Sequence, residues 1–168
     1  ESLDHPDWLK ILPIKNALNF IITDKVVDSL YGDKLERIIQ REGLRVKKIV
    51  VNPGEKAKSF ETYKQTACSI LASDMNKYSY IVGFGGGVVN NLAGFLASTL
   101  YRGIGLIQIT TTLLAQVDAA IDFKQAINSY IGKNHIGSYY PASTIVVDFS
   151  LLQTLPERHI KNCLAESI

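Results

Sequence analysis

The sequence lacks the features that mark secreted proteins and nucleic-acid-binding proteins. Cysteine is scarce: Cys68 and Cys163 are the two among 168 residues, and their separation fits neither a metal-binding nor a redox motif. We expect both to be buried or half-buried free thiols in a reducing compartment, here the cytoplasm. An excess of charge of one sign is also missing, since the formal net charge is +2 and the lysines are spread along the chain. Nucleic acid is therefore not an expected partner.

A secretory signal and an uninterrupted apolar run are missing as well. The first seven residues are acidic and lack a basic region followed by an apolar one. Residues 80–109 form the most apolar stretch, but Asn90, Asn91, Arg102 and several glycines interrupt it. Because polar groups are costly in hydrocarbon, we expect no membrane partner.

What the chain does contain is a regular alternation of short apolar runs and stretches of helical periodicity. The runs predict strands over 18–23, 46–51, 78–84, 105–109 and 144–148, and the periodicity predicts helices over 26–40, 59–76 and 88–101. Parallel neighbours in a sheet need a crossover helix between them. The pattern therefore predicts an α/β fold with a doubly wound, mainly parallel, Rossmann-like sheet, in which ligands bind beyond the carboxyl ends of the strands.

Three glycines, Gly85, Gly86 and Gly87, separate the third expected strand from the helix that follows it. Without a Cβ atom they permit a tight turn and let a ligand approach the main chain closely. The helix N-terminus adds unpaired N–H groups and the positive end of its dipole, which favour a phosphate. A dinucleotide or another phosphorylated ligand is the candidate, but the full G-x-G-x-x-G pattern is missing, and a plain strand-to-helix turn is about as common.

The segment from Thr110 to Tyr140 breaks the alternation. It is rich in Thr, Gly, Lys and Asn, and its helical periodicity is interrupted, so we expect a long irregular stretch. Such stretches in compact domains are disproportionately functional. Further on, Thr154 and Glu157 fit a capping box with an early proline at Pro156, which predicts a helix that starts there and still runs at Ile168.

Six short motifs occur in order from residue 85 onward: GGGVVNNLAGF (85–95), YRGI (101–104), TTLLAQVD (111–118), GKN (132–134), TLPER (154–158) and LAE (164–166). As a set they resemble the motifs of 3-dehydroquinate synthase and its relatives, the sugar-phosphate cyclases. The resemblance runs from about Asp24 to the last residue and is dense from Ile81 onward.

The resemblance implies an enzyme that uses NAD transiently together with one divalent metal ion, zinc or cobalt. Such an enzyme oxidises a ring hydroxyl of a sugar phosphate, eliminates phosphate, reduces the ketone again and closes a carbocycle by an intramolecular aldol step. Oxidation to a ketone acidifies the neighbouring C–H, which makes the loss of phosphate feasible. For the full-length protein the family also implies a cytoplasmic homodimer in the shikimate pathway of aromatic amino acid biosynthesis.

The same resemblance divides the chain. Residues 1–150 correspond to the NAD-binding α/β domain, and residues 151–168 correspond to the start of a helical domain that binds metal and substrate. Most of that helical domain is absent from this chain. We therefore expect the chain alone to bind NAD at best and to be inactive as an enzyme, because a catalytic zinc site needs about three protein ligands.

The resemblance also implies roles for individual residues. It assigns one metal ligand, Glu166. Charge-assisted donors and hydroxyl acceptors suited to a sugar phosphate are implied at Arg102, Asp118, Lys124 and Asn134. The residues implied to contact NAD are Asp24, Glu55, Lys58, Gly85, Gly86, Gly87, Asn91, Thr111, Thr112, Lys133 and Thr154. His135 and His159 receive no role, and Tyr139 and Tyr140 are expected to pack.

Two departures leave the substrate open. Asn91 stands where 3-dehydroquinate synthases carry Asp beside the nicotinamide, and residues 121–128 replace their stretch ending in Lys-Thr-Gly-Val-Asn. Both changes are similar to 2-deoxy-scyllo-inosose synthase, which cyclises glucose 6-phosphate. The other motifs favour 3-deoxy-arabino-heptulosonate 7-phosphate, which is our narrow preference. A metal-dependent polyol dehydrogenase and a non-catalytic nucleotide-binding module are the remaining alternatives.

Overall fold

The fold is built on a five-stranded sheet in a computed structural model that describes residues 3, 7–11 and 17–166. All neighbouring strands of the sheet are parallel, and they lie in the order β2-β1-β3-β4-β7. The strands are β1 (Leu18–Asp24), β2 (Arg45–Val51), β3 (Tyr80–Gly85), β4 (Gly105–Thr110) and β7 (Thr144–Val147). The chain runs from β1 to β2 on one side and then crosses to β3 on the other. The expected doubly wound sheet is confirmed, and the strand order reverses between β1 and β3, where such sheets bind ligands.

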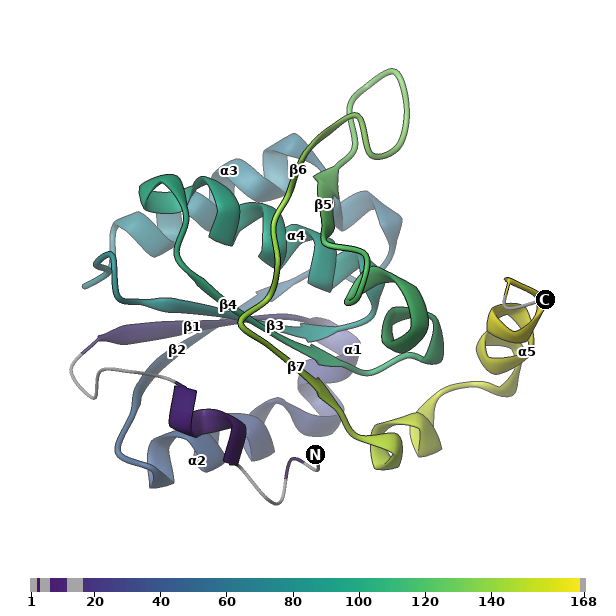
Figure 1. Cartoon of the computed structure of the whole chain (residues 1–168), viewed down its shortest axis with the longest axis horizontal. Coiled ribbons are helices and arrows are strands. Elements are labelled where there is room, and N and C mark those ends of the chain that lie inside the picture. The colour runs from purple at the N-terminus through teal and green to yellow at the C-terminus, as the bar shows by residue number, and fades with distance from the viewer. Residues whose placement is uncertain (1–2, 4–6, 12–16, 167–168) are drawn as a thin grey trace.

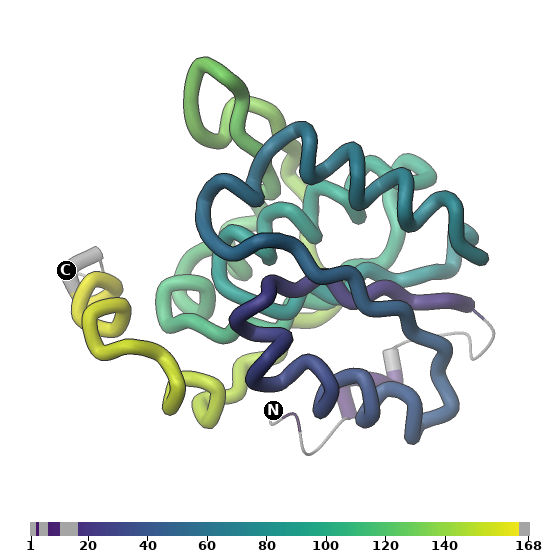
Figure 2. Tube along the Cα trace, turned by 180° about the vertical axis from the view of Figure 1, so that it is seen from behind, coloured from purple at the N-terminus to yellow at the C-terminus, as the bar shows by residue number. Residues whose placement is uncertain are grey.

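Helices cover both faces of the sheet (Figure 1). One face carries α3 (Phe60–Leu71) and α4 (Gly87–Thr99), and the other carries α2 (Asp33–Arg41) and the 3₁₀ helix η1 (Asp7–Ile11). The C-terminal helix α5 (Glu157–Glu166) lies beside the sheet rather than on either face (Figure 2). No helix in the described part of the chain is long and apolar enough to cross a membrane. The remaining helical segments are α1 (Lys25–Val27), η2 (Asp28–Gly32), η3 (Glu55–Ala57), η4 (Leu100–Arg102), η5 (Ala115–Ala119) and η6 (Phe149–Thr154).

Two hydrophobic cores fill the spaces between the sheet and its helices. Successive strand residues point to opposite faces, so Phe20 and Ile22 pack toward α3 and α4, whereas Ile21 packs toward α2. All three side chains are fully buried. Burial of an apolar side chain of this size stabilises the fold by about 1.5–3 kcal/mol. Burial on both faces explains why the central strands β1, β3 and β4 read as nearly continuous apolar runs, whereas the edge strand β2 is partly exposed and carries Lys47 and Lys48.

The expected helix over 26–40 is interrupted by the π-helical turn η2. Lys48 on β2 lies against this turn, and its Nζ is 2.8 Å from carboxylate oxygens of Asp28 and Asp33 and 3.5 Å from Glu36. Burial alone would lower the pKa of Lys48, but its contacts with Asp28 and Asp33 outweigh burial and hold the pKa above its ordinary value. Lys48 in turn lowers the pKa of Asp33. These ion pairs fix the helical layer to the edge strand.

Three further expectations need correction. The segment expected to be irregular contains an antiparallel hairpin, β5 (Lys124–Ile127) and β6 (Ile136–Tyr139), which packs on α4. Helix α3 ends at Leu71, five residues before the expected end. Both cysteines are free thiols, and Cys163 is buried as expected, but Cys68 is exposed because it lies on the outer face of α3.

Helix α5 begins at Glu157, where a helix start was expected. The described hydrogen bonds of Thr154 differ from those of a capping box. Its hydroxyl lies 2.9 Å from the Tyr31 hydroxyl and donates to the Leu151 carbonyl at 3.4 Å. Thr154 therefore connects the segment before α5 to the η2 turn.

Candidate functional site

The carboxyl ends of three neighbouring strands bring the expected cofactor residues to one edge of the sheet. Thr23 pairs with Phe84, so Asp24 at the end of β1 lies beside Gly85 at the end of β3. Gly85 pairs in turn with Thr110 at the end of β4, and the Thr111 N–H donates to the Gly85 carbonyl at 3.0 Å. Residues from distant parts of the sequence thus meet at the point where the strand order reverses.

The glycine turn, which consists of Gly85, Gly86 and Gly87, needs its glycines for space. None of the three has a positive φ, and Gly86 has φ −80° and ψ −175°, a conformation open to any residue. A Cβ atom on Gly85 would lie 2.7 Å from the Val89 side chain, and one on Gly86 would lie 3.1 Å from Cγ2 of Thr112. The main chain is therefore bare where α4 begins, and the first N–H groups of a helix have no acceptor within the helix.

Asp24 is already used by the fold. Its Oδ1 accepts hydrogen bonds from the N–H groups of Val26 (2.8 Å) and Val27 (3.1 Å) and so caps α1. Capping of this kind stabilises a helix by about 1 kcal/mol. Both bonds use the same oxygen, which leaves Oδ2 for a ligand at the sheet edge.

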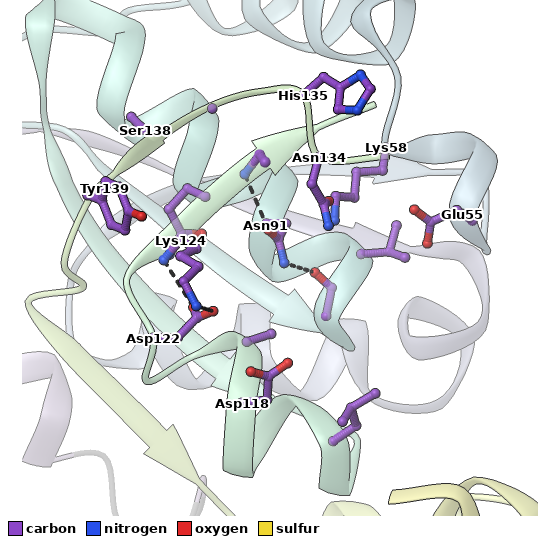
Figure 3. A pocket seen from close by; sticks show the side chains of 17 residues that line it. Glu55, Lys58, Asn91, Asp118, Asp122, Lys124, Asn134, His135, Ser138 and Tyr139 are labelled. Carbon is purple, nitrogen blue, oxygen red and sulfur yellow. Dashed lines mark hydrogen bonds and ion pairs between the residues drawn. The ribbon is translucent and has the colours of Figure 1, made fainter. Parts of the chain in front are cut away.

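A pocket of about 590 Å³ opens between the start of α4, the η5 turn and the β5–β6 hairpin. Figure 3 shows side chains from all these elements directed into it. Seven of the residues singled out in the sequence line the pocket: Glu55, Lys58, Gly87, Asn91, Asp118, Lys124 and Asn134. Three further lining residues, Asp122, Gln125 and His135, were given no role from the sequence. Tyr139 was expected to pack, but it is exposed and lines the pocket. Gln125 and Tyr139 lie on the strands of the hairpin and His135 lies in its loop, and the hairpin itself was not expected.

The pocket is lined by charges of both signs. Lys58 is only 6% exposed, and burial lowers the pKa of its ammonium group, an effect that the nearby Glu55 carboxylate opposes. Lys124 is more exposed, and its Nζ lies 3.3 Å from Oδ2 of Asp122. A buried ammonium group gains from an anionic partner, so the Lys58 end suits a phosphate or a carboxylate better than it suits a neutral group.

Asn91 connects the glycine turn to the hairpin. Its Nδ2 donates to the Gly87 carbonyl at 2.9 Å, and its Oδ1 accepts from the Ala126 N–H at 3.2 Å. An aspartate at this position could accept from the Ala126 N–H but could not donate to the Gly87 carbonyl, and its charge would face that carbonyl. The amide therefore matches this arrangement of α4 and β5.

A buried polar cluster fixes the hairpin on α4. Gln108, Gln125 and Asn90 are each at most 1% exposed. The Gln108 Nε2 donates to Gln125 Oε1 at 3.3 Å, and the Gln125 Nε2 donates to the Tyr140 carbonyl at 3.4 Å. Gly94 leaves room for the Gln125 side chain, because a Cβ atom at position 94 would lie 2.0 Å from Gln125 Oε1. Gln125 thus holds β5, and with it Lys124, against the helix.

Several residues implied by the family motifs do not line this pocket. Arg102 is exposed at the far end of α4, about 20 Å along a 13-residue helix from the glycine turn. It follows Tyr101, and both have a positive φ, 51° and 65°. Lys133 is exposed but close enough to Lys58 to lower the pKa of that side chain further. Their roles stay predictions.

The expected metal ligand, Glu166, is the last residue of α5, and its side chain lies outside what the structure describes. Across the described residues, no three His, Cys, Asp or Glu side chains lie close enough together to hold a metal ion. The side chains that the structure describes therefore do not form a metal site by themselves.

Comparison with known proteins identifies the family. Residues 48–162 match the family model described as the N-terminal part of 3-dehydroquinate synthase. The chain belongs to the 3-dehydroquinate synthase family. A 3-dehydroquinate synthase from Clostridium botulinum is 42% identical over 149 residues, which cover 89% of this chain and 43% of that relative. The matched region includes the glycine turn, the hairpin and most of the pocket lining.

Solved structures confirm the fold of this 3-dehydroquinate synthase family chain. The 2-epi-5-epi-valiolone synthase of Streptomyces hygroscopicus, solved with NAD+ and Zn2+, is 32% identical with a TM-score of 0.88 over 98% of this chain and 45% of that one. A 2-deoxy-scyllo-inosose synthase, solved with carbaglucose 6-phosphate, NAD+ and Co2+, is 29% identical with a TM-score of 0.89. It is covered over 44% of its length. The chain thus spans less than half the length of these relatives.

Proposed function

We propose that this chain is the cofactor-binding part of an NAD- and divalent-metal-dependent sugar-phosphate cyclase that releases phosphate and forms a carbocycle. One observation carries the proposal: Gly87 at the end of the glycine turn and the β5–β6 hairpin line one pocket that contains both cofactor and substrate candidates. Relatives solved with NAD+ and a metal ion share this fold over nearly the whole chain. Residues 1–150 form the cofactor domain in this proposal, and residues 151–168 begin the next one.

The fit to NAD rests on the bare main chain of the glycine turn. A pyrophosphate placed there would receive N–H groups of the first turn of α4 and the positive end of its dipole. Asp24 and Thr112 flank the turn: Asp24 Oδ2 can accept a hydrogen bond from a ribose hydroxyl, and the Thr112 hydroxyl can donate one to a phosphate oxygen. Lys58 adds an ammonium group that burial leaves in need of a negative partner.

The substrate residues would act by binding and orienting a polyol. Bound NAD supplies a hydride acceptor for one ring hydroxyl. The Asp118 carboxylate can accept hydrogen bonds from ring hydroxyls, and the Lys124 Nζ can donate up to three hydrogen bonds to hydroxyl or phosphate oxygens. The Asn134 amide can do both. Because Asn91 ties the glycine turn to β5, these groups are held at a fixed distance from the cofactor.

The proposed substrate is 3-deoxy-arabino-heptulosonate 7-phosphate, as in the 3-dehydroquinate synthases that match at about 40% identity. One observation favours glucose 6-phosphate as a second candidate. Asp122 pairs with Lys124 and reduces the positive charge that a substrate carboxylate would need. Asn91, whose amide suits its two partners, supports the same alternative.

The family relationship also supports a metal site with Glu166 as one ligand and zinc or cobalt as the metal. We further propose that the full-length enzyme is a cytoplasmic homodimer that acts in the shikimate pathway. No step above depends on the metal, because its site cannot be built from the described residues.

The test is phosphate release by the product of the complete reading frame, supplied with NAD and cobalt. Release from 3-deoxy-arabino-heptulosonate 7-phosphate is the expected result. Release from glucose 6-phosphate alone would transfer the assignment to the second candidate. Accumulation of NADH with a simple polyol, without phosphate release, would contradict the cyclase and support a dehydrogenase.

A further inference from the structure

Asn128 makes an unusual number of polar contacts for a residue outside the pocket lining. It follows β5 directly, is half-buried, and forms an isolated parallel bridge with Ser59. Its main-chain N–H donates to the Lys58 carbonyl at 2.8 Å. Its side-chain Nδ2 donates to Glu55 Oε1 at 2.8 Å, and its Oδ1 accepts from the Asn134 N–H at 3.0 Å.

These contacts join two groups of pocket residues that are far apart in the sequence. Glu55 and Lys58 belong to the segment around η3, on one wall of the pocket, and Asn134 belongs to the loop between β5 and β6 (Figure 3). Asn134 has φ +60°, a conformation that costs free energy for a residue with a side chain. A hydrogen bond to its N–H helps to hold it there.

Only an amide serves both contacts. Nδ2 must donate to a carboxylate while the oxygen accepts from an N–H group, and neither Asp nor Ala can do both. A hydrogen bond to a charged group such as Glu55 contributes about 1.5–3 kcal/mol. The loop has a second, separate closure, since the Ser129 N–H donates to the Gly132 carbonyl at 2.9 Å. Replacement of the Asn128 side chain should therefore weaken the connection between the two walls of the pocket, while the Ser129–Gly132 hydrogen bond keeps the loop folded.

We propose that Asn128 is a positioning residue that couples the Glu55–Lys58 wall to the Asn134 loop, so that the cofactor side and the substrate side of the pocket keep one geometry. The assignment of one side of the pocket to NAD and the other to substrate rests on the proposed function. The coupling itself rests only on the contacts of Asn128.

The first test replaces the amide by a carboxylate. In Asn128→Asp two carboxylates would lie about 2.8 Å apart, so they cannot both ionise without repulsion, and one takes up a proton more readily. At pH 8 we expect NAD to bind at least tenfold more weakly than to wild type. At pH 5.5 a shared proton restores a hydrogen bond, and we expect the deficit to shrink to about threefold or less.

The pH dependence caused by the new carboxylate pair must be separated from that caused by other titratable groups nearby. The charged and titratable side chains around the pair are Lys56, Lys58, Lys133, His135 and Asp122. They are the same in both proteins, so the ratio of the variant and wild-type dissociation constants at each pH isolates the new pair. Asn128→Ala should give a loss that does not vary with pH, and Asn162→Asp, on the exposed face of α5, controls for added negative charge.

The second test exchanges the partners. In Glu55→Gln/Asn128→Asp the new amide donates to the new carboxylate, so the hydrogen bond returns with its direction reversed at the wild-type net charge. The double variant should bind NAD more tightly than the product of the two single effects predicts. Equal, pH-independent losses in Asn128→Asp and Asn128→Ala, or a purely multiplicative double variant, would overturn the proposal.

Amide hydrogen exchange gives a readout that does not need NAD. At pH 7.5 residues 128–135 should exchange faster in Asn128→Asp than in wild type and recover toward wild type in the double variant. Absence of NAD binding by wild type would contradict the proposed function alone. Unchanged exchange in this loop in Asn128→Asp would contradict the coupling alone.

Discussion

Gly94→Ala should destabilise the protein, although alanine is the better helix former. Gly94 lies in the middle of α4, where alanine normally stabilises a helix by about 1 kcal/mol relative to glycine. Here a Cβ atom would lie 2.0 Å from Oε1 and 2.3 Å from Cδ of Gln125. The Gln125 side chain must therefore leave its position under the helix.

The cost can be worked from the hydrogen bonds that this displacement breaks. Gln125 would lose its contacts with Gln108 and with the Tyr140 carbonyl, at about 1 kcal/mol each. The Gln108 amide would stay buried with fewer partners, which costs a further 1–3 kcal/mol or so. Subtracting the gain in helix propensity leaves a net destabilisation of about 2–4 kcal/mol.

Urea unfolding of four proteins tests this estimate: wild type, Gly94→Ala, Gln125→Ala and the double variant. In the Gln125→Ala background the space under the helix is empty, so Gly94→Ala should be neutral or stabilising by up to about 1 kcal/mol. The same substitution thus changes sign with its background, a coupling that the double-mutant cycle measures directly. Equal effects of Gly94→Ala in both backgrounds would refute the packing of Gln125 against α4.

Three further predictions concern the cofactor side and the helical layer. Gly86→Val should weaken NAD binding in calorimetry more than tenfold, about 1.4 kcal/mol, because its Cβ would fill the turn beside Thr112; unchanged affinity in a folded variant would place the cofactor elsewhere. Lys48→Met should destabilise by about 1–3 kcal/mol between about pH 5 and 9. In urea unfolding, the difference in stability between wild type and Lys48→Met should shrink in acid. The folded protein lowers the pKa of Asp33, so the ion pair with Lys48 stabilises the fold fully above the ordinary pKa of Asp33 and stops doing so as the pH falls through the lowered pKa. NAD binding should take up protons in alkaline buffer, since an anion raises the lowered pKa of Lys58; calorimetry in buffers of different ionisation enthalpy measures this uptake, and Lys58→Met should abolish it.

The sheet could be predicted from the sequence because its central strands β1, β3 and β4 are nearly continuous apolar runs, whereas the edge strand β2 carries lysines among its apolar residues. Burial on both faces requires such runs, and the helices between them carry clear periodicity, for example Leu35 and Ile39 on α2. The glycine turn was found for the same reason, since it joins two well-defined elements. Its glycines serve space rather than a positive φ, which only the contacts with Val89 and Thr112 reveal.

The hairpin could not be predicted, because its strands are four residues long and are held by tertiary contacts. Gln125 is a polar residue in a buried position, and its partners Gln108 and Tyr140 lie 17 and 15 residues away. No local pattern signals such a cluster. The same holds for Asn128, whose importance depends on Glu55, a residue 73 positions away in the sequence.

Motif comparison supplied the roles of Arg102 and Glu166, and the structure leaves the Arg102 side chain outside the pocket lining. Arg102 lies at the opposite end of α4, and the side chain of Glu166 lies outside the described residues. Spacing along the sequence cannot tell which end of a helix faces a ligand. Their roles stay predictions.

The most direct test of the central claim is a crystal structure of this chain with NAD bound. We expect the pyrophosphate over the N–H groups of Gly86 and Gly87, with the nicotinamide ring beside Asn91 and facing Lys124. Ordered NAD at any other position on the sheet, or an empty glycine turn in a crystal soaked at saturating NAD, would contradict it.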